Sequence, residues 1–127
     1  MATVDHSLTY RVHAVANLVS AVAPGGTLVI SVPIEIGMVG LAKLGAKLAY
    51  GYDLSQLPQR PGLLRSYVGA LVAGTRISQF RDDRPGWGTH FGFDYRDLDD
   101  LLSQSEVEVR RWNSFTTRFY VARVRRA

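Results

Sequence analysis

The stretch APGGTLVISVP, residues 23–33, decides the fold prediction because it joins a turn to a short apolar strand. Pro24, Gly25 and Gly26 are turn residues of the kind that end a helix. The next residues, 27–32, are mostly apolar or β-branched, and Pro33 ends the run. A short run of this kind is typical of a strand that is buried on both faces of a parallel sheet. We therefore expect an α/β fold.

The segments around this strand carry helical periodicity. Before it, apolar residues recur at steps of three and four over residues 8–22. After it, residues 34–50 are apolar nearly all round and contain three glycines, which predicts a loose helix or helical loop. Residues 63–72 repeat the amphipathic pattern. Asp94 and Asp97 stand at the spacing of a capping box, which predicts a short helix after them.

The C-terminal part of the chain predicts an antiparallel hairpin. Residues 106–112 and 116–124 alternate between apolar and polar side chains, with Asn113, Ser114 and Phe115 as the turn between them. The length of 127 residues favours one domain, 1–127. The strand at 27–32 needs parallel neighbours, and the residues before it supply at most a stub. The sequence is therefore typical of the second half of a larger sheet.

Composition excludes several classes of protein. Apolar residues make up 46% and charged residues 20%, which indicates a folded chain. The absence of cysteine excludes disulfides, thiolate catalysis and Cys-based metal sites. No uncharged apolar stretch is long enough for a membrane span, and the first residues do not form a signal peptide. We expect a cytoplasmic location.

The positive charge is concentrated at the C-terminal end of the sequence. The net charge is +4, and six of the 15 basic residues fall in the last 18 positions: Arg110, Arg111, Arg118, Arg123, Arg125 and Arg126. Such a cluster can attract phosphate in nucleic acid, a membrane or a cofactor. It can equally form the solvated face of a strand.

The ordered set of segments resembles the class I S-adenosylmethionine-dependent methyltransferases, especially their type 11 small-molecule group. Asp5 and His6 stand where that family has an acid–histidine pair after its fourth strand, and His6 lies 18 positions before Pro24. Pro-Gly-Gly then leads into the equivalent of the fifth strand. The segment from His90 to Tyr95 is similar to the family's late segment, and the hairpin would match strands six and seven. The resemblance covers essentially the whole chain and implies a partial Rossmann-like sheet, from about strand four or five to strand seven.

The family binds its cofactor mainly through its first half, and this sequence departs from that pattern. A Gly-rich loop after strand one and an acidic residue after strand two hold S-adenosylmethionine in the family. This sequence contains no G-x-G-x-x-G motif, and its glycine pairs stand in other contexts. The resemblance therefore implies the C-terminal half of a methyltransferase domain, with the N-terminal cofactor-binding half missing through truncation, a split gene or a fragment. We expect the chain to be inactive by itself.

The resemblance also implies a set of site residues. His6 and His90 are the candidate catalytic bases, and Asp5 is the candidate cofactor-binding residue. The candidate acceptor-binding residues are Pro33, Glu35, Trp87, Phe91 and Phe93. For Asp5 and His6 the alternative is a role in capping the next helix, and for the aromatic residues it is a place in the core. The three histidines do not converge in the sequence pattern, so no metal site is expected.

Three functions remain open from the sequence. The first is methyl transfer to a small-molecule acceptor, with a complementing N-terminal half or a second copy as partner. The second is a non-catalytic remnant that binds a partner protein. The third is a nucleic-acid or membrane-surface binder that uses the Arg-rich hairpin and the helix carrying Lys43 and Lys47.

Overall fold

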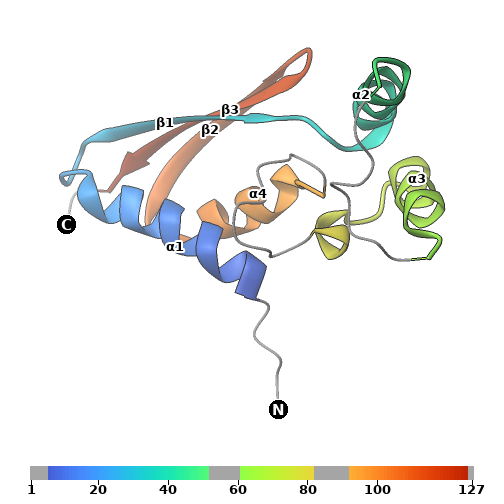
Figure 1. The fold of residues 1–127 in the computed structure, drawn as a ribbon. Helices are drawn as coiled ribbons and strands as arrows, with labels where there is room; N and C mark the ends of the chain where they lie inside the picture. Colours follow the sequence, from blue (N-terminus) through green and yellow to red (C-terminus); the bar gives the residue numbers. More distant parts are fainter. Residues whose placement is uncertain (1–5, 52–60, 82–91, 126–127) are drawn as a thin grey trace. The chain divides into compact units, whose positions relative to one another are not determined.

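The computed structural model describes residues 6–51, 61–81 and 92–125 as a mixed α/β fold (Figure 1). Along the chain the elements are α1 (His6–Ala21), β1 (Thr27–Pro33), α2 (Gly37–Ala49), α3 (Leu63–Ala73), the short 3-10 helix η2 (Ser78–Phe80), α4 (Tyr95–Gln104), β2 (Val107–Ser114) and β3 (Thr117–Val124). The predicted helices, the strand after the Pro-Gly-Gly turn and the C-terminal hairpin are confirmed.

The three strands form one antiparallel sheet in the order β1-β3-β2. β3 is the central strand; it pairs Tyr120 with Ile30 of β1 on one side and with Arg111 of β2 on the other. The prediction of a parallel strand buried on both faces is wrong for β1 in the described part of the chain. Its partner is antiparallel and its exposure alternates from residue to residue. Thr27 and Ser31 already alternate with apolar residues, and Val29 between them obscures that pattern.

One face of the sheet, which we call the inner face, is covered by α1 and α4 (Figure 1). Its core consists of Leu102, Val107, Tyr120 and Ala122, packed with Val15 and Val19 of α1, Leu28, Ile30 and Val32 of β1, and Leu98, Val109 and Val124. The opposite face, the outer face, carries the alternate residues of each strand. No helix of the described residues is packed into a core on that face.

The Pro-Gly-Gly turn ties α1 and β1 to the far end of the chain. The Gly25 N–H donates to the Val124 carbonyl at 3.0 Å, and the Val124 N–H donates to the Gly26 carbonyl at the same distance. Gly25 has a φ of 81°, and a Cβ on Gly26 would lie 2.6 Å from Val22 Cγ1. Glycine is required here because the turn needs a left-handed backbone and a close approach of the helix.

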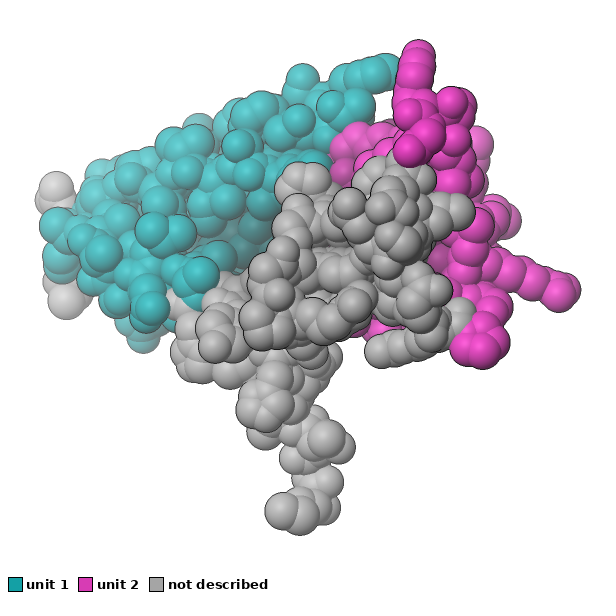
Figure 2. Space-filling model, viewed as in Figure 1, with its two compact units in different colours: residues 1–33, 95–127 teal, residues 34–94 magenta. Residues whose placement is uncertain are grey.

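The described chain divides into two compact units (Figure 2). Unit 1 comprises residues 1–33 and 95–127 and contains the sheet, α1 and α4; unit 2, residues 34–94, is inserted between β1 and α4. The core of unit 2 is formed by α2, α3 and the residue before η2: Leu44, Leu63, Tyr67, Ala70, Leu71 and Ile77, with Phe80 of η2 packed against them. The prediction of a single domain over 1–127 stays a prediction. None of the described helices is long and apolar enough to cross a membrane.

Candidate functional site

The structure places four of the eight candidate site residues. His6 is the first residue of α1, and Pro33 is the last residue of β1. Glu35 and Phe93 belong to unit 2. Asp5, Trp87, His90 and Phe91 lie outside the described residues. The roles of His6 and His90 as candidate bases therefore stay predictions.

Glu35 is a buried carboxylate whose charge is balanced by two lysines of α2. It follows β1 by two residues and is 5% exposed. Its Oε1 accepts a hydrogen bond from Lys43 Nζ at 3.0 Å, and its Oε2 lies 3.9 Å from Lys47 Nζ. Lys43 and Lys47 stand one helical turn apart on α2, so both ammonium groups reach the same carboxylate. Only the carboxylate is buried, and both lysines are partly exposed, so Glu35 is the group that would be left uncompensated if both ammonium groups were removed.

The close approach that buries Glu35 depends on a glycine in the first turn of α2. A Cβ on Gly40 would overlap the Glu35 carbonyl oxygen and touch Leu71 Cδ2 at 3.0 Å. The Gly40 N–H donates to the Ile36 carbonyl at 3.1 Å. Gly40 lowers the helix propensity of this segment, as expected from the sequence. Because it has no Cβ, the first turn of α2 can lie directly against the segment that follows β1.

Tyr67 is a polar site residue that sequence reasoning assigned only to an apolar helix face. Its phenol oxygen accepts the Gly92 N–H at 3.5 Å. Burial raises the pKa of Tyr67 to about 12, the nearby charges of Glu35 and Asp94 act in the same direction, and the Gly92 hydrogen bond opposes them. The phenol consequently stays protonated at neutral pH and can act only as a hydrogen-bonding group there.

Asp94 completes this group of buried polar side chains in unit 2. It is 2% exposed, and its Oδ2 accepts the backbone N–H of Ile77 at 3.1 Å. The sequence pattern identified Asp94 as a helix cap, and α4 does begin at the next residue. Glu35, Tyr67 and Asp94 form what we call the carboxylate–phenol cluster, with Phe93 half-buried beside Asp94 in the chain.

The carboxylate–phenol cluster can hold backbone and side-chain groups in place, and its chemistry does not indicate a metal site. Within the described ranges, no three His, Asp or Glu side chains are arranged to hold a metal ion. The carboxylate of Glu35 is occupied by Lys43, and one oxygen of Asp94 is occupied by Ile77. The described part of the chain therefore provides no free acidic side chain in this cluster for the ribose of a cofactor.

A second polar network lies on the inner face of the sheet in unit 1, around Arg118. Its guanidinium makes hydrogen bonds of 3.1 to 3.3 Å to both carboxylate oxygens of Asp99, one of 3.1 Å to the Tyr120 hydroxyl and one of 2.8 Å to Asn113 Oδ1. It also stacks over the Tyr95 ring, 4.5 Å from the centroid. Arg111 lies 3.6 Å from the same Asp99. The network joins α4 to the hairpin.

The solvated strand face considered for the basic residues of the hairpin is wrong for Arg118. The alternation of the strand places Arg118 on the same face as Tyr120 and turns it toward α4. Burial alone would lower the pKa of the Arg118 guanidinium, but the Tyr120 hydroxyl and Asp99 outweigh it and raise that pKa. Arg118 is therefore a charged structural residue.

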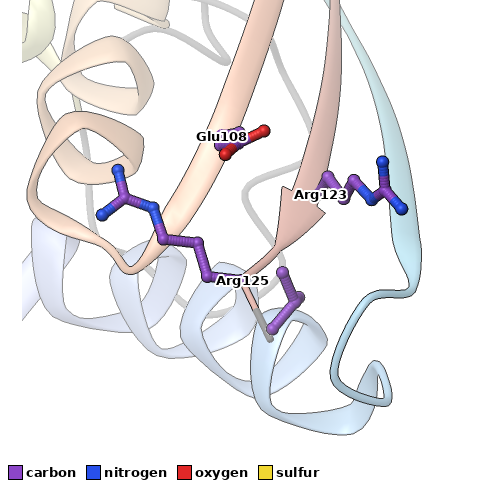
Figure 3. A pocket seen from close by; sticks show the side chains of 4 residues that line it. Glu108, Arg123 and Arg125 are labelled. Carbon is purple, nitrogen blue, oxygen red and sulfur yellow. The ribbon is translucent and has the colours of Figure 1, made fainter. Parts of the chain in front are cut away.

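An open depression of about 410 Å³ lies at the C-terminal end of β3, lined by Glu108, Arg123, Val124 and Arg125. Figure 3 shows the guanidinium groups of Arg123 and Arg125 on opposite sides of β3, with Glu108 between them. Because the two cations diverge and a carboxylate separates them, the depression does not form a focused anion site.

Comparisons with known proteins add no further constraint: no protein-family model, curated protein or solved structure matches the chain.

Proposed function

We propose that this chain is the acceptor-side half of a class I S-adenosylmethionine-dependent methyltransferase domain with a small-molecule acceptor, and that another segment supplies the Gly-rich cofactor loop. The order of elements supports the proposal. A helix, a Pro-Gly-Gly turn, a strand, further helices and a terminal hairpin follow one another as the resemblance implies. The hairpin joins the strand that follows the turn, so both belong to one sheet.

The observation that carries the proposal is the free edge of β1. β1 pairs with β3 along one edge only and is the outermost strand of the described sheet. Val29 in its middle is 66% exposed. An apolar edge strand with unpaired backbone groups is a template for another strand. The resemblance places the fourth strand of a methyltransferase sheet at this edge.

The residues beyond the carboxyl end of β1 have a defined role in this proposal. In open α/β sheets, ligands bind outside the carboxyl ends of the strands. Pro33 ends β1, and Glu35 is fixed there by Lys43. We assign Glu35 to shaping the crevice wall, because its charge is already satisfied. His6 and His90 remain the candidate bases that would take a proton from an acceptor.

The described residues do not form a cofactor site by themselves. S-adenosylmethionine, when bound, supplies the methyl group. This sequence offers no Gly-rich loop for its backbone, and Glu35 already binds Lys43. The proposal therefore assigns cofactor binding to the complementing segment and assigns to this chain the orientation of the acceptor and the removal of its proton.

A fusion experiment tests the proposal. The N-terminal half of a class I methyltransferase, including its Gly-rich loop, is fused ahead of Met1, and binding of S-adenosylmethionine is measured by titration calorimetry. We expect the fusion to bind the cofactor and the chain alone not to bind it. The control fusion carries valines in place of the loop glycines. A fusion that folds, as judged by circular dichroism, and still binds no cofactor contradicts the proposal, as does micromolar binding by the chain alone.

Substitutions in an active fusion separate the assigned roles. His6→Ala or His90→Ala should lower methyl transfer by roughly 100-fold if that histidine is the base. Arg125→Ala, next to the end of β3, should leave it unchanged, since isolated surface substitutions have small effects. If Arg125→Ala lowers methyl transfer and the two histidine variants do not, the functional surface is the basic hairpin.

A further inference from the structure

The turn of the β2–β3 hairpin contains a residue that the fold alone does not explain. Phe115 is the first of the two residues that connect Ser114 to Thr117. It is 92% exposed and has a φ of 38°. Glycine is favoured at a first turn position with positive φ, because a side chain there is strained. The chain thus places a large apolar ring in solvent and in an unfavourable backbone conformation at the same time.

Two further aromatic residues stand directly behind this turn on the outer face. Trp112 of β2 pairs with Phe119 of β3, two positions from the last pair of the hairpin. Their rings are stacked with centroids 5.4 Å apart, and Trp112 remains 47% exposed. At about 3.3 Å per residue, the pair lies roughly 7 Å behind the last pair of the hairpin. We call Phe115, Trp112 and Phe119 the aromatic end of the hairpin.

Charge is absent from the turn and returns farther along the strands. Residues 112–117 contain no charged side chain. On the outer face, Arg110 precedes Trp112 by two positions, and Arg123 lies farther along β3. Both are exposed, and neither guanidinium forms an ion pair with a described residue. The outer face therefore runs from an uncharged aromatic end to Arg110, and beyond it to Arg123, which lies opposite Glu108.

We propose that the aromatic end of the hairpin inserts into the interfacial layer of an anionic lipid bilayer, with Arg110 nearest the lipid phosphates and Arg123 farther from them. Aromatic rings with a polar edge, such as Trp112, favour the boundary between headgroups and acyl chains, and Phe115 would enter the apolar side of it. Arg110, roughly 13 Å behind the last pair of the hairpin, is attracted to the anionic headgroups, and Arg123, roughly 20 Å behind it, adds a weaker attraction. The inference is independent of the proposed function.

The position of Phe115 favours a bilayer over single-stranded nucleic acid. Bases stack on aromatic rings that lie flat on a sheet, with basic residues along the same groove. Trp112 and Phe119 meet that description, but they already stack on each other. Phe115 stands at the turn itself, beyond the last strand pair and off the face on which bases would stack. A single-stranded polynucleotide would leave this ring in solvent, whereas a bilayer buries it.

Vesicle binding measures the proposal directly. The full chain is mixed with vesicles of phosphatidylcholine alone or of phosphatidylcholine with phosphatidylserine, and co-sedimentation is measured. We expect binding to the anionic vesicles and little to the neutral ones. The sequence has two tryptophans. In a Trp87→Phe background, the emission of Trp112 should shift to shorter wavelength on binding.

Phe115→Gly separates insertion from folding. It removes the inserting ring and relaxes the positive φ, so the variant should be at least as heat-stable as the parent and bind anionic vesicles about tenfold less tightly or worse. Arg110→Gln with Arg123→Gln should abolish the preference for anionic over neutral vesicles. The matched control is Arg65→Gln, an exposed arginine of α3 in unit 2, which should change nothing.

Three outcomes overturn the proposal: no binding to anionic vesicles, full binding by Phe115→Gly, or binding of a single-stranded oligonucleotide without binding of vesicles. The last result would assign the outer face to nucleic acid.

Discussion

The two faces of the sheet use the same residue type in opposite ways. Arg111 and Arg118 on the inner face bind Asp99 of α4, and Arg118 also contacts Tyr95, Asn113 and Tyr120. On the outer face, Arg110 and Arg123 form no ion pair with the described residues. A shift of one position along a strand thus changes an arginine from a structural connector to an available cation. The position of an arginine along its strand, rather than the composition of the strand, decides whether its guanidinium can contact a ligand.

The largest difference between the faces should appear on truncation of a ring. Tyr120 is fully buried on the inner face, and Tyr120→Ala should lower the free energy of unfolding by about 3–5 kcal/mol. Val121 is its neighbour on the outer face and is only half-buried. Val121→Ala should therefore lower the free energy of unfolding by less than about 1 kcal/mol. Urea unfolding of both variants measures the contrast, and equal losses would show that the outer face is also a core.

Removing the shared carboxylate tests the inner-face network. Asp99→Asn should lower the free energy of unfolding by about 1–2 kcal/mol, because two guanidinium groups lose their counter-charge at a partly exposed site. Arg110→Gln on the outer face should stay within about 0.5 kcal/mol. Thermal denaturation at low and high salt distinguishes them, since only the first variant should lose its salt dependence.

The hairpin turn should respond in the opposite direction. Phe115→Gly should raise the free energy of unfolding by about 1 kcal/mol, since glycine adopts the positive φ of that position without strain. Phe115→Ala keeps the strained backbone and should not give this gain. A destabilised glycine variant would mean that the ring packs on the fold, and would remove the reason for seeking an external partner.

The last prediction concerns the phenol proton of Tyr120, whose effect on stability is smallest at neutral pH. Burial, followed by Asp99, raises the pKa of this phenol above its ordinary value of 10.0. The folded state then holds the proton more tightly than the unfolded state, so the contribution to stability is complete below pH 10 and is lost as the pH rises beyond it. Tyr120→Phe should therefore flatten the decline of stability above pH 10. Parallel slopes in the two proteins would contradict the raised pKa.

Local sequence signals predicted the elements well and their pairing less well. The Pro-Gly-Gly turn, the amphipathic helices and the alternating hairpin each follow from the identities of neighbouring residues. The antiparallel placement of β1 against β3 joins residues from opposite ends of the chain. An apolar run such as residues 27–32 fits a parallel and an antiparallel neighbour equally, so its partner could not be deduced.

The candidate site was predictable only in part, for a related reason. Glu35 was selected because it follows the strand; it forms an ion pair with Lys43, and its role in acceptor binding stays a prediction. Tyr67 was missed because one aromatic residue on an amphipathic helix looks like any core residue until Glu35 and Asp94 are placed near it. Asp99 was missed because it is adjacent to Asp100, and two neighbouring acids on a helix are typical of a solvated surface. In each case the decisive partner is remote in the sequence.

The pairing of β1 with β3 also has a kinetic consequence. Thr27 pairs with Arg123 and Pro33 with Thr117, so all of unit 2 lies within the loop that this pairing closes. The β2–β3 hairpin needs only local contacts and can form quickly, whereas β1 must cross almost the full length of the chain to reach it. A collapsed unit 2 would shorten the effective loop and reduce its closure entropy. Until β1 pairs with β3, that edge of β3 stays open during folding, and a misfolded neighbour would attach there.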